Sequence, residues 1–292
     1  MLLLQLIVNG LVAGAIYALM ALGFAVIYNA TRIFHIAHGA VYAVGGYVFY
    51  ALAIGLKVNP LVAFVLVVPA TAAAGAAIEL LVYRPARNRR AGLFALFIIS
   101  LGLLVFMQNA LSVLFGGDTK SVWPGALPNY DLGGIVVTPY HLAVVASCVI
   151  VFPLVQWFVT RTRTGKAIQA LSANRELADV VGVDVPRLYV VVFAVGSALA
   201  GIAAALLSID LGVNPGMAFT VITFAAISVI IGGVGHLPGA AVGGFLLGLL
   251  QSLAVWFLPL AWQDVVVYGL LFLFLLFRPH GIFGQRLVTR QV

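Results

Sequence analysis

Charged residues are scarce in this chain. Lys, Arg, Asp and Glu make up 8% of the 292 residues, and hydrophobic residues make up 64%. A soluble domain usually carries about 25% charged residues, so the composition excludes an ordinary water-exposed surface. The mean hydropathy of +1.18 agrees with this. Apolar stretches recur from residue 2 to residue 277 without a long polar linker, which predicts a single transmembrane domain over residues 1–292.

Cysteine and enzyme motifs are nearly absent as well. The single cysteine, Cys148, lies within an apolar run and excludes an internal disulfide. The sequence contains no HExxH or GxSxG motif, and its Gly165-Lys166 pair lacks the glycine pattern of a phosphate-binding loop. We therefore expect a protein that is not an enzyme, has no ATPase site of its own and uses no cofactor.

No acidic residue falls in the middle of an apolar run. Buried charges in a bilayer are costly, and ion-coupled carriers commonly depend on them. Glu79 comes closest, but we expect it to reach the cytoplasmic interface near Arg84 as a structural charge. The pattern favours a path for neutral or zwitterionic solutes that is driven by energy supplied elsewhere. An ion-coupled secondary carrier, an intramembrane enzyme and an energy-independent pore are the alternatives.

Long apolar runs are what the chain does contain. A bilayer core about 30 Å thick requires roughly 20 apolar residues in a helix. The runs predict an all-α, polytopic transmembrane bundle of eight or nine spans, in which the short or glycine-interrupted ones form broken helices. The nine candidate runs are residues 2–28, 33–54, 60–82, 94–115, 140–159, 188–209, 218–231, 240–258 and 263–277.

The basic residues between these runs predict the orientation. The net charge is +7, and all 15 Lys and Arg except Lys57 and Lys120 fall on one side when the runs alternate across the membrane. Cytoplasmic loops carry such an excess, so no nucleic-acid partner is needed to explain the charge. We expect a multi-pass membrane protein with its N-terminus outside and its C-terminus in the cytoplasm.

Polar side chains inside the apolar runs are candidates for lining a solute path. His35 and His38 are spaced to share a helical face, but no Cys, Asp or Glu lies near enough to complete a metal site, so we expect none. Ordinary hydrogen bonding between helices is the alternative role for each polar residue. The candidate path residues are Asn9, Asn29, His35, His38, Thr223 and Ser228.

The longest basic segment, residues 160–187, reads TRTRTGKAIQALSANRELADVVGVDVPR. Its Ala and Leu residues recur at helical spacing, and Ser172 or Asn174 could cap a helix. A short helix on the cytoplasmic side is typical of a docking element. A helix that lies on the membrane surface without a partner is the alternative.

Two glycine-rich stretches are alike. Residues 232–244 (GGVGHLPGAAVGG) and residues 38–47 (HGAVYAVGGY) each combine a histidine, a Gly-Ala step and a later Gly-Gly, although the Gly-Ala steps fall at different offsets. Such pairs suggest an internal structural repeat around a central cavity.

Three ordered stretches carry a family resemblance. They are NGLVAGAIYALMALGFAVIYNATRIFHIAHGAVYAVGGY, TRTGKAIQALSANRELADVVGVDVPRLYVVVFAVGSALAGIAA and FAAISVIIGGVGHLPGAAVGGFLLGLLQ, followed by RPHGIFG. Over nearly its whole length the chain resembles the permeases of the branched-chain amino-acid (Liv-type) ABC uptake family.

The resemblance implies an importer with several subunits in the bacterial inner membrane, in which the N-terminus of this chain would be periplasmic. A periplasmic solute-binding protein would deliver solute to two paired permeases, this chain and a homologous second one, above two cytoplasmic ABC ATPase subunits. The implied cargo is a branched-chain amino acid or a similar small solute. Urea, short amides and aromatic acids are alternatives within the same family.

The resemblance also implies roles for individual residues. ABC importers carry an Ala-x-x-x-Gly feature in a cytoplasmic coupling helix, and Ala178 and Gly182 fit that spacing. Arg175, Glu176 and Asp179 would accompany them in the contact with the ATPase. The family usually has Asn-Phe-Ala-His-Gly where this chain has HIAHG from residue 35, so the histidine there could signal a different cargo.

Overall fold

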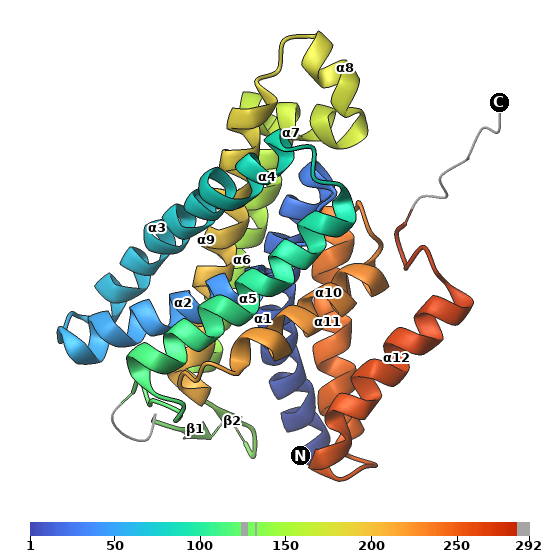
Figure 1. The fold of residues 1–292 in the computed structure, drawn as a ribbon. Helices are drawn as coiled ribbons and strands as arrows, with labels where there is room; N and C mark the ends of the chain where they lie inside the picture. Colours follow the sequence, from blue (N-terminus) through green and yellow to red (C-terminus); the bar gives the residue numbers. More distant parts are fainter. Residues whose placement is uncertain (124–127, 132, 285–292) are drawn as a thin grey trace.

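Helices form almost all of the computed structural model, which describes residues 1–123, 128–131 and 133–284 (Figure 1). The predicted all-α, polytopic bundle is confirmed. The helices are α1 (Leu2–Thr31), α2 (His38–Tyr50), α3 (Pro60–Ile78), α4 (Arg84–Asn88), α5 (Leu93–Phe115), α6 (Pro139–Arg161), α7 (Arg163–Ala173), α8 (Arg175–Val180), α9 (Val185–Leu211), α10 (Met217–Gly232), α11 (Leu237–Ala254) and α12 (Gln263–Phe277).

Short turns of other helix types extend several of these elements. The π-helical turn η1 (Ala51–Gly55) continues α2, the π-helical turn η2 (Glu79–Tyr83) joins α3 to α4, and the 3₁₀ turn η3 (Leu260–Trp262) leads into α12. With these extensions, eight helical segments of the described chain are long and apolar enough to cross a membrane. The seventh predicted run became α10, whose 16 residues are only about 24 Å long.

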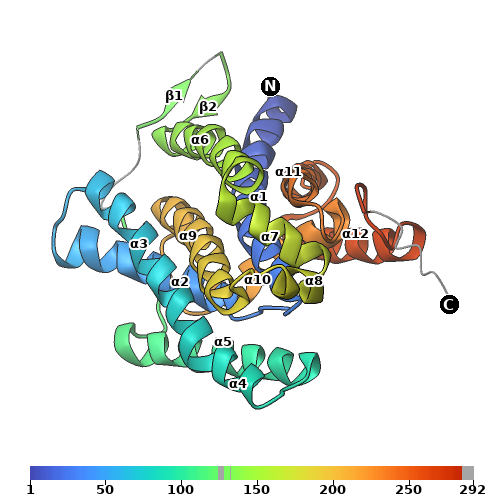
Figure 2. The same ribbon diagram turned by 90° about the horizontal axis from the view of Figure 1, so that it is seen from above.

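Helix α1 forms the centre of the bundle. It is buried over most of its length and lies between α9, α10 and α11 (Figure 2). Its closest neighbour is α11, where Gly248 packs directly on the backbone of Gly14, and Gly244 packs on the backbone of Ala18. The small residues at these positions allow the two helices to approach closely. Close packing stabilises helix pairs in lipid, where the hydrophobic effect does not drive helices together.

The bundle has two distinct ends (Figure 1). The hairpin end carries the two short antiparallel strands β1 (Tyr130–Asp131) and β2 (Val136–Val137), together with the start of α1. A pair of backbone hydrogen bonds between Lys120 and Val213, 2.8 and 2.9 Å long, also ties loops together there. The α8 end carries α4, α7 and α8, and the last turn of α1 reaches it, because Arg32 donates a hydrogen bond to the carbonyl of Ser172 at 2.8 Å.

Helix α2 begins inside the bundle. The chain reverses direction after Arg32, and His38, the first residue of α2, lies against Gly23 in the interior of α1. Its neighbour Gly39 packs on the backbone of Ala218 in α10. Of the predicted span over residues 33–54, the first five residues are not helical, and the helix then runs from His38 to Gly55 without a break.

The two similar glycine-rich stretches occupy equivalent helix starts. His38 is the first residue of α2, and His236 is the N-cap of α11, where its Nδ1 accepts a hydrogen bond from the Gly239 amide at 3.0 Å. Each histidine precedes an Ala-Val-Gly-Gly run by the same number of residues. Both helices thus use a histidine at the start and a glycine pair for close packing.

Candidate functional site

A cavity of about 720 Å³ opens at the hairpin end of the bundle. Its walls come from α1, α6, α9 and α10, with β2 and the loop before α10 at its margin. The apolar part of the lining includes Val12, Ile16, Val221 and Phe224. The volume falls within the range of about 300–1,000 Å³ that is typical of small-molecule sites.

Polar groups of several kinds enter the same cavity. Its walls include the carboxylate of Asp210, the imidazole of His141, the amide of Asn214 and the hydroxyl-bearing residues Tyr17 and Thr220. The Tyr17 hydroxyl donates a 2.8 Å hydrogen bond to Oε1 of Gln251, which fixes its ring at the wall. A few polar groups in a largely apolar enclosure suit a small solute that carries both a polar head and an apolar body.

The rim of the cavity is rigid. The Gln5 side chain pairs with the backbone of Val136, accepting from its amide at 2.7 Å and donating to its carbonyl at 3.2 Å. Gln5 also donates to Oδ1 of Asn9 at 2.9 Å. His141 is held by the capping box of α6, in which its side chain and that of Thr138 bond each other's backbone amides. The Gln5 contacts tie α1 to the hairpin, and the capping box fixes the first turn of α6.

The six candidate path residues are not brought together. Asn9 lines the cavity, but the other five do not. The hydroxyls of Thr223 and Ser228 donate to carbonyls one turn earlier in their own helix, at 2.8 and 2.7 Å. This is the ordinary behaviour of such residues in membrane helices.

His35, His38 and Asn29 are buried deeper in the bundle. Nδ1 of His35 lies 2.8 Å from the Tyr83 hydroxyl, and the His35 ring packs on Phe193 with 5.0 Å between ring centroids. Both histidines are fully buried, and their remaining ring nitrogens have no hydrogen-bond partner within the described residues. They form an internal polar cluster beside the start of α2.

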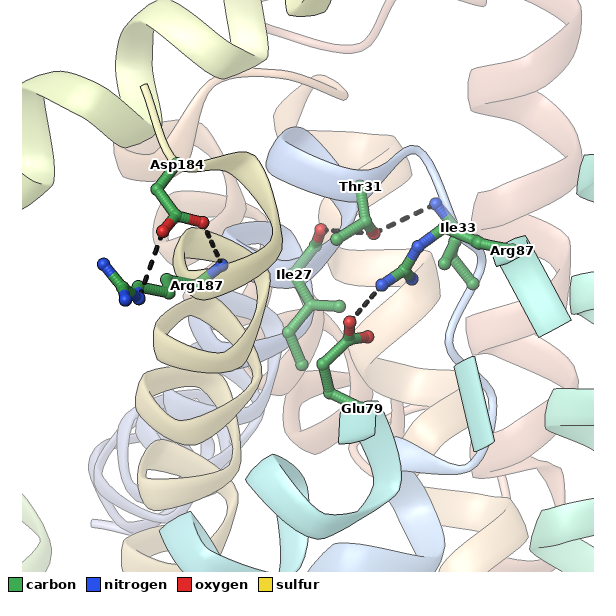
Figure 3. A network of polar contacts seen from close by, with 7 residues as sticks. All are labelled: Ile27, Thr31, Ile33, Glu79, Arg87, Asp184 and Arg187. Carbon is green, nitrogen blue, oxygen red and sulfur yellow. Dashed lines mark hydrogen bonds and ion pairs between the residues drawn. The ribbon is translucent and has the colours of Figure 1, made fainter. Parts of the chain in front are cut away.

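Glu79, which we expected to be a structural charge near the cytoplasmic interface, is also buried within the bundle. Its side chain is fully buried and forms an ion pair with Arg87, two helical turns further along (Figure 3). The π-helical turn η2 lies between the two residues. A buried pair of this kind is sensitive to the loss of either partner, because the remaining charge is left without compensation.

The candidate coupling residues lie at the α8 end. Asn174 caps α8, its side chain accepting from the Leu177 amide at 3.1 Å, as one of the two predicted caps. Ala178 faces inward and is buried, whereas Arg175, Glu176 and Asp179 are exposed. Gly182 has a φ of 88°, a left-handed conformation that suits glycine and ends the turn after α8.

Helix α8 also displays apolar side chains. Leu177, Val180 and Val181 are 62%, 83% and 75% exposed. Helix α8, which carries Leu177 and Val180, lies at the outermost tip of the molecule (Figure 1). Three exposed apolar side chains close together in one short segment form a candidate interaction surface.

Three polar residues of the cavity are not among the predicted path residues. Asp210, His141 and Asn214 lie near the ends of predicted runs, where polar residues are also expected at the membrane surface. The useful signal was Asp210 itself, an acid within one turn of a long apolar run. Among the described residues, no three His, Cys, Asp or Glu side chains gather closely enough to hold a metal ion.

Comparison with known proteins gives a consistent result. Residues 6–275 match the family described as the branched-chain amino acid transport system permease component. The chain is 35% identical to the high-affinity branched-chain amino acid transport system permease protein BraD of Pseudomonas aeruginosa, covering 97% of this chain and 96% of that one. It is 32% identical to the corresponding LivH protein of Escherichia coli, with the same coverage of both chains.

A more distant relative matches only part of the chain. A xylose transport system permease protein, XylH of Escherichia coli, is 31% identical over 40% of this chain. No solved structure matches the chain.

Proposed function

The chain belongs to the permease-component family of branched-chain amino acid transport systems, and we propose that it moves such amino acids inward through the cavity at the hairpin end. It is a multi-pass membrane transport subunit. The cavity is the observation that supports the proposal, because one enclosure combines an apolar wall with a carboxylate, an imidazole and amides.

The cavity chemistry suits a zwitterion with an apolar side chain. The carboxylate of Asp210 could accept from an ammonium group, and donors such as Asn214 could meet a carboxylate. Val12, Ile16, Val221 and Phe224 could enclose an aliphatic side chain. Urea or a short amide would leave this apolar wall unused, so these alternatives are less well supported.

Uptake in membrane vesicles that contain the assembled transporter tests this proposal. We expect Asp210→Asn to reduce leucine uptake at least about tenfold, because an ion-pair contact is lost. Asp118→Asn is the control, since Asp118 is exposed at the hairpin end but does not line the cavity. Equal uptake by the two variants would show that Asp210 does not contact the solute. Preferred uptake of urea or aromatic acids would show that branched-chain amino acids are not the cargo.

The proposed partners follow from the two ends of the bundle. The hairpin end would face a periplasmic solute-binding protein, and α8 would dock on one of two cytoplasmic ATPase subunits that supply the energy. A homologous permease would pair with this chain. In this arrangement Arg175, Glu176, Ala178, Asp179 and Gly182 belong to the coupling surface, and the N-terminus is periplasmic.

The exposed apolar residues of α8 support the docking proposal. We expect Val180→Asp to abolish solute-stimulated ATP hydrolysis of the assembled complex, because a charge would be placed in the contact. Val180→Leu keeps the apolar surface and should retain activity. The docking proposal fails if both variants assemble with the ATPase and hydrolyse ATP equally well. It fails equally if the purified chain alone moves solute down an ion gradient.

A further inference from the structure

A second cavity, of about 290 Å³, lies at the α8 end between α4, α8 and the start of α9. Three arginines, Arg84, Arg87 and Arg175, line it together with the amide side chain of Asn88. Asp179 is the acidic residue among the described lining residues, so the cavity carries an excess of positive charge. We call it the arginine pocket.

The guanidinium group of Arg87 is incompletely paired. Nη2 bonds Glu79, but Nη1 is buried and has no hydrogen-bond partner among the residues the structure describes (Figure 3). A buried, charged donor without an acceptor is costly. Oε2 of Glu79 likewise has no partner among the described residues, so this ion pair is only partly satisfied, and a bound anion would offer Nη1 of Arg87 a further acceptor.

Tyr189 contacts two of the three arginines in the pocket. The central carbon of Arg87 lies 4.4 Å from the centroid of the Tyr189 ring, and that of Arg175 lies 5.8 Å from it. Cation–π attraction to the ring offsets part of the repulsion between these two cations. A bound anion in the pocket that both arginines line would offset more of it.

The position of the arginine pocket selects the kind of anion. Arg84 and Arg87 lie where the span Pro60–Asn88 ends, and Tyr189 lies where the span Val185–Leu211 begins. Just before Arg84, Leu80 and Leu81 are 42% and 76% exposed on the bundle surface. The arginine pocket thus places cations at the end of the spans, close in sequence to exposed apolar residues. An anionic phospholipid has matching parts, because its phosphate would meet the cations and its acyl chains would meet the apolar side chains.

We propose that the arginine pocket binds the phosphate group of an anionic phospholipid, whose acyl chains lie along the surface near Leu81. Guanidinium groups bind phosphate oxygens through paired, charge-assisted hydrogen bonds. Basic pockets on the cytoplasmic side of helical membrane proteins favour such head groups. Because Arg175 belongs to α8 and Arg84 to α4, the bound phosphate would also hold α8 against the bundle.

Native mass spectrometry of the full-length chain tests the proposal. The purified protein is titrated with phosphatidylglycerol or with phosphatidylcholine of the same acyl chains. We compare it with an Arg84→Gln/Arg175→Gln double variant and with Arg89→Gln/Arg163→Gln as a control. The control removes the same charge from exposed residues that do not line the pocket.

We expect the wild type and the control to bind phosphatidylglycerol in preference to phosphatidylcholine. The pocket variant should lose about fivefold in affinity for each arginine removed. Equal phosphatidylglycerol binding by pocket variant and control would overturn the proposal. So would binding of inorganic phosphate with no preference between the two lipids, which would assign the pocket to a free anion.

A contact with an acidic segment of a partner protein is distinguished in the same way. In that case the pocket variant would keep its phosphatidylglycerol preference but fail to assemble with the ATPase, and the lipid proposal would be wrong. The lipid titration needs no transport activity, so its outcome does not depend on the proposed function.

Discussion

Nδ1 of His35 lies 2.8 Å from the hydroxyl oxygen of Tyr83, and this contact joins the segment before α2 to the π-helical turn η2. Both side chains are fully buried. At His35 the chain turns back into the bundle. The contact with Tyr83 holds this turn against η2, the helical turn that begins at Glu79. The start of α2 is therefore fixed by side chains rather than by a regular helical connection.

Replacing Tyr83 tests the contribution of this contact. Tyr83→Phe keeps the ring and leaves Nδ1 of His35 buried without a partner, so we expect a loss of about 1–3 kcal/mol in stability. Thermal unfolding of the purified protein in detergent measures it. Tyr50→Phe is the control, because no hydrogen bond of the Tyr50 hydroxyl occurs within the described chain. If both variants unfold at the same temperature, the contact contributes nothing.

His35→Asn tests whether this histidine selects the cargo. The sequence pattern suggested a role in selectivity, since the family usually has asparagine at this position. His35 is fully buried and does not line the cavity at the hairpin end. We therefore expect His35→Asn to lower the unfolding temperature and to leave the order of preference among leucine, urea and an aromatic acid unchanged. A changed order of preference in uptake would place His35 on the path.

The sequence predicted the elements better than it predicted their contacts. Apolar runs and interrupting glycines identify spans because the bilayer imposes a minimum length and forbids unpaired backbone groups. Whether a polar residue near the end of a run faces lipid, water or a cavity depends on helix rotation and tilt. Asp210 and Glu79 show this, since one lines a cavity and the other is buried in an ion pair.

The pairing of Glu79 with Arg87 was not predictable from their spacing. Side chains three or four positions apart usually meet on a helix, and these two are separated by twice that distance and by a π-helical turn. The turn shifts the register of the following residues and carries Arg87 over the Glu79 carboxylate. Arg84, the nearer arginine, forms no ion pair with Glu79 within the described residues, although both arginines line the arginine pocket.

Removing one charge of the buried ion pair should destabilise the protein more than removing both charges. Arg87→Gln leaves the Glu79 carboxylate buried without its cation, and we expect a loss of about 3–5 kcal/mol in stability. The double variant Glu79→Gln/Arg87→Gln removes both charges and should recover much of that loss. Thermal unfolding of the single and double variants gives the coupling energy. Additive losses from the two sites would show that the charges do not interact.

Gly248 is required by the close packing of α11 on α1. A methyl group at this position would collide with the backbone of Gly14, which cannot move without shifting α1. We expect Gly248→Ala to destabilise the protein by about 1–3 kcal/mol. Gly102→Ala in α5 is the control, because no described atom lies within 4 Å of the added carbon. The control should unfold at the wild-type temperature or above it, since alanine favours helix.

The proposed orientation can be tested with single cysteines. Cys148 is 6% exposed and lies within α6, so a membrane-impermeant maleimide should not label the wild type. Asp118 is exposed near the hairpin end and Glu176 is exposed in α8, at opposite ends of the bundle. The result does not depend on whether the chain has eight or nine spans, because each position reports its own side of the membrane.

We expect Asp118→Cys to be labelled from the periplasmic side, after the outer membrane is permeabilised. Glu176→Cys should be labelled only when the inner membrane is opened as well. This follows from the excess of Lys and Arg in the segments around α7 and α8, because such residues are retained in the cytoplasm. The opposite pattern would invert the orientation, and α8 could then not meet an ATPase.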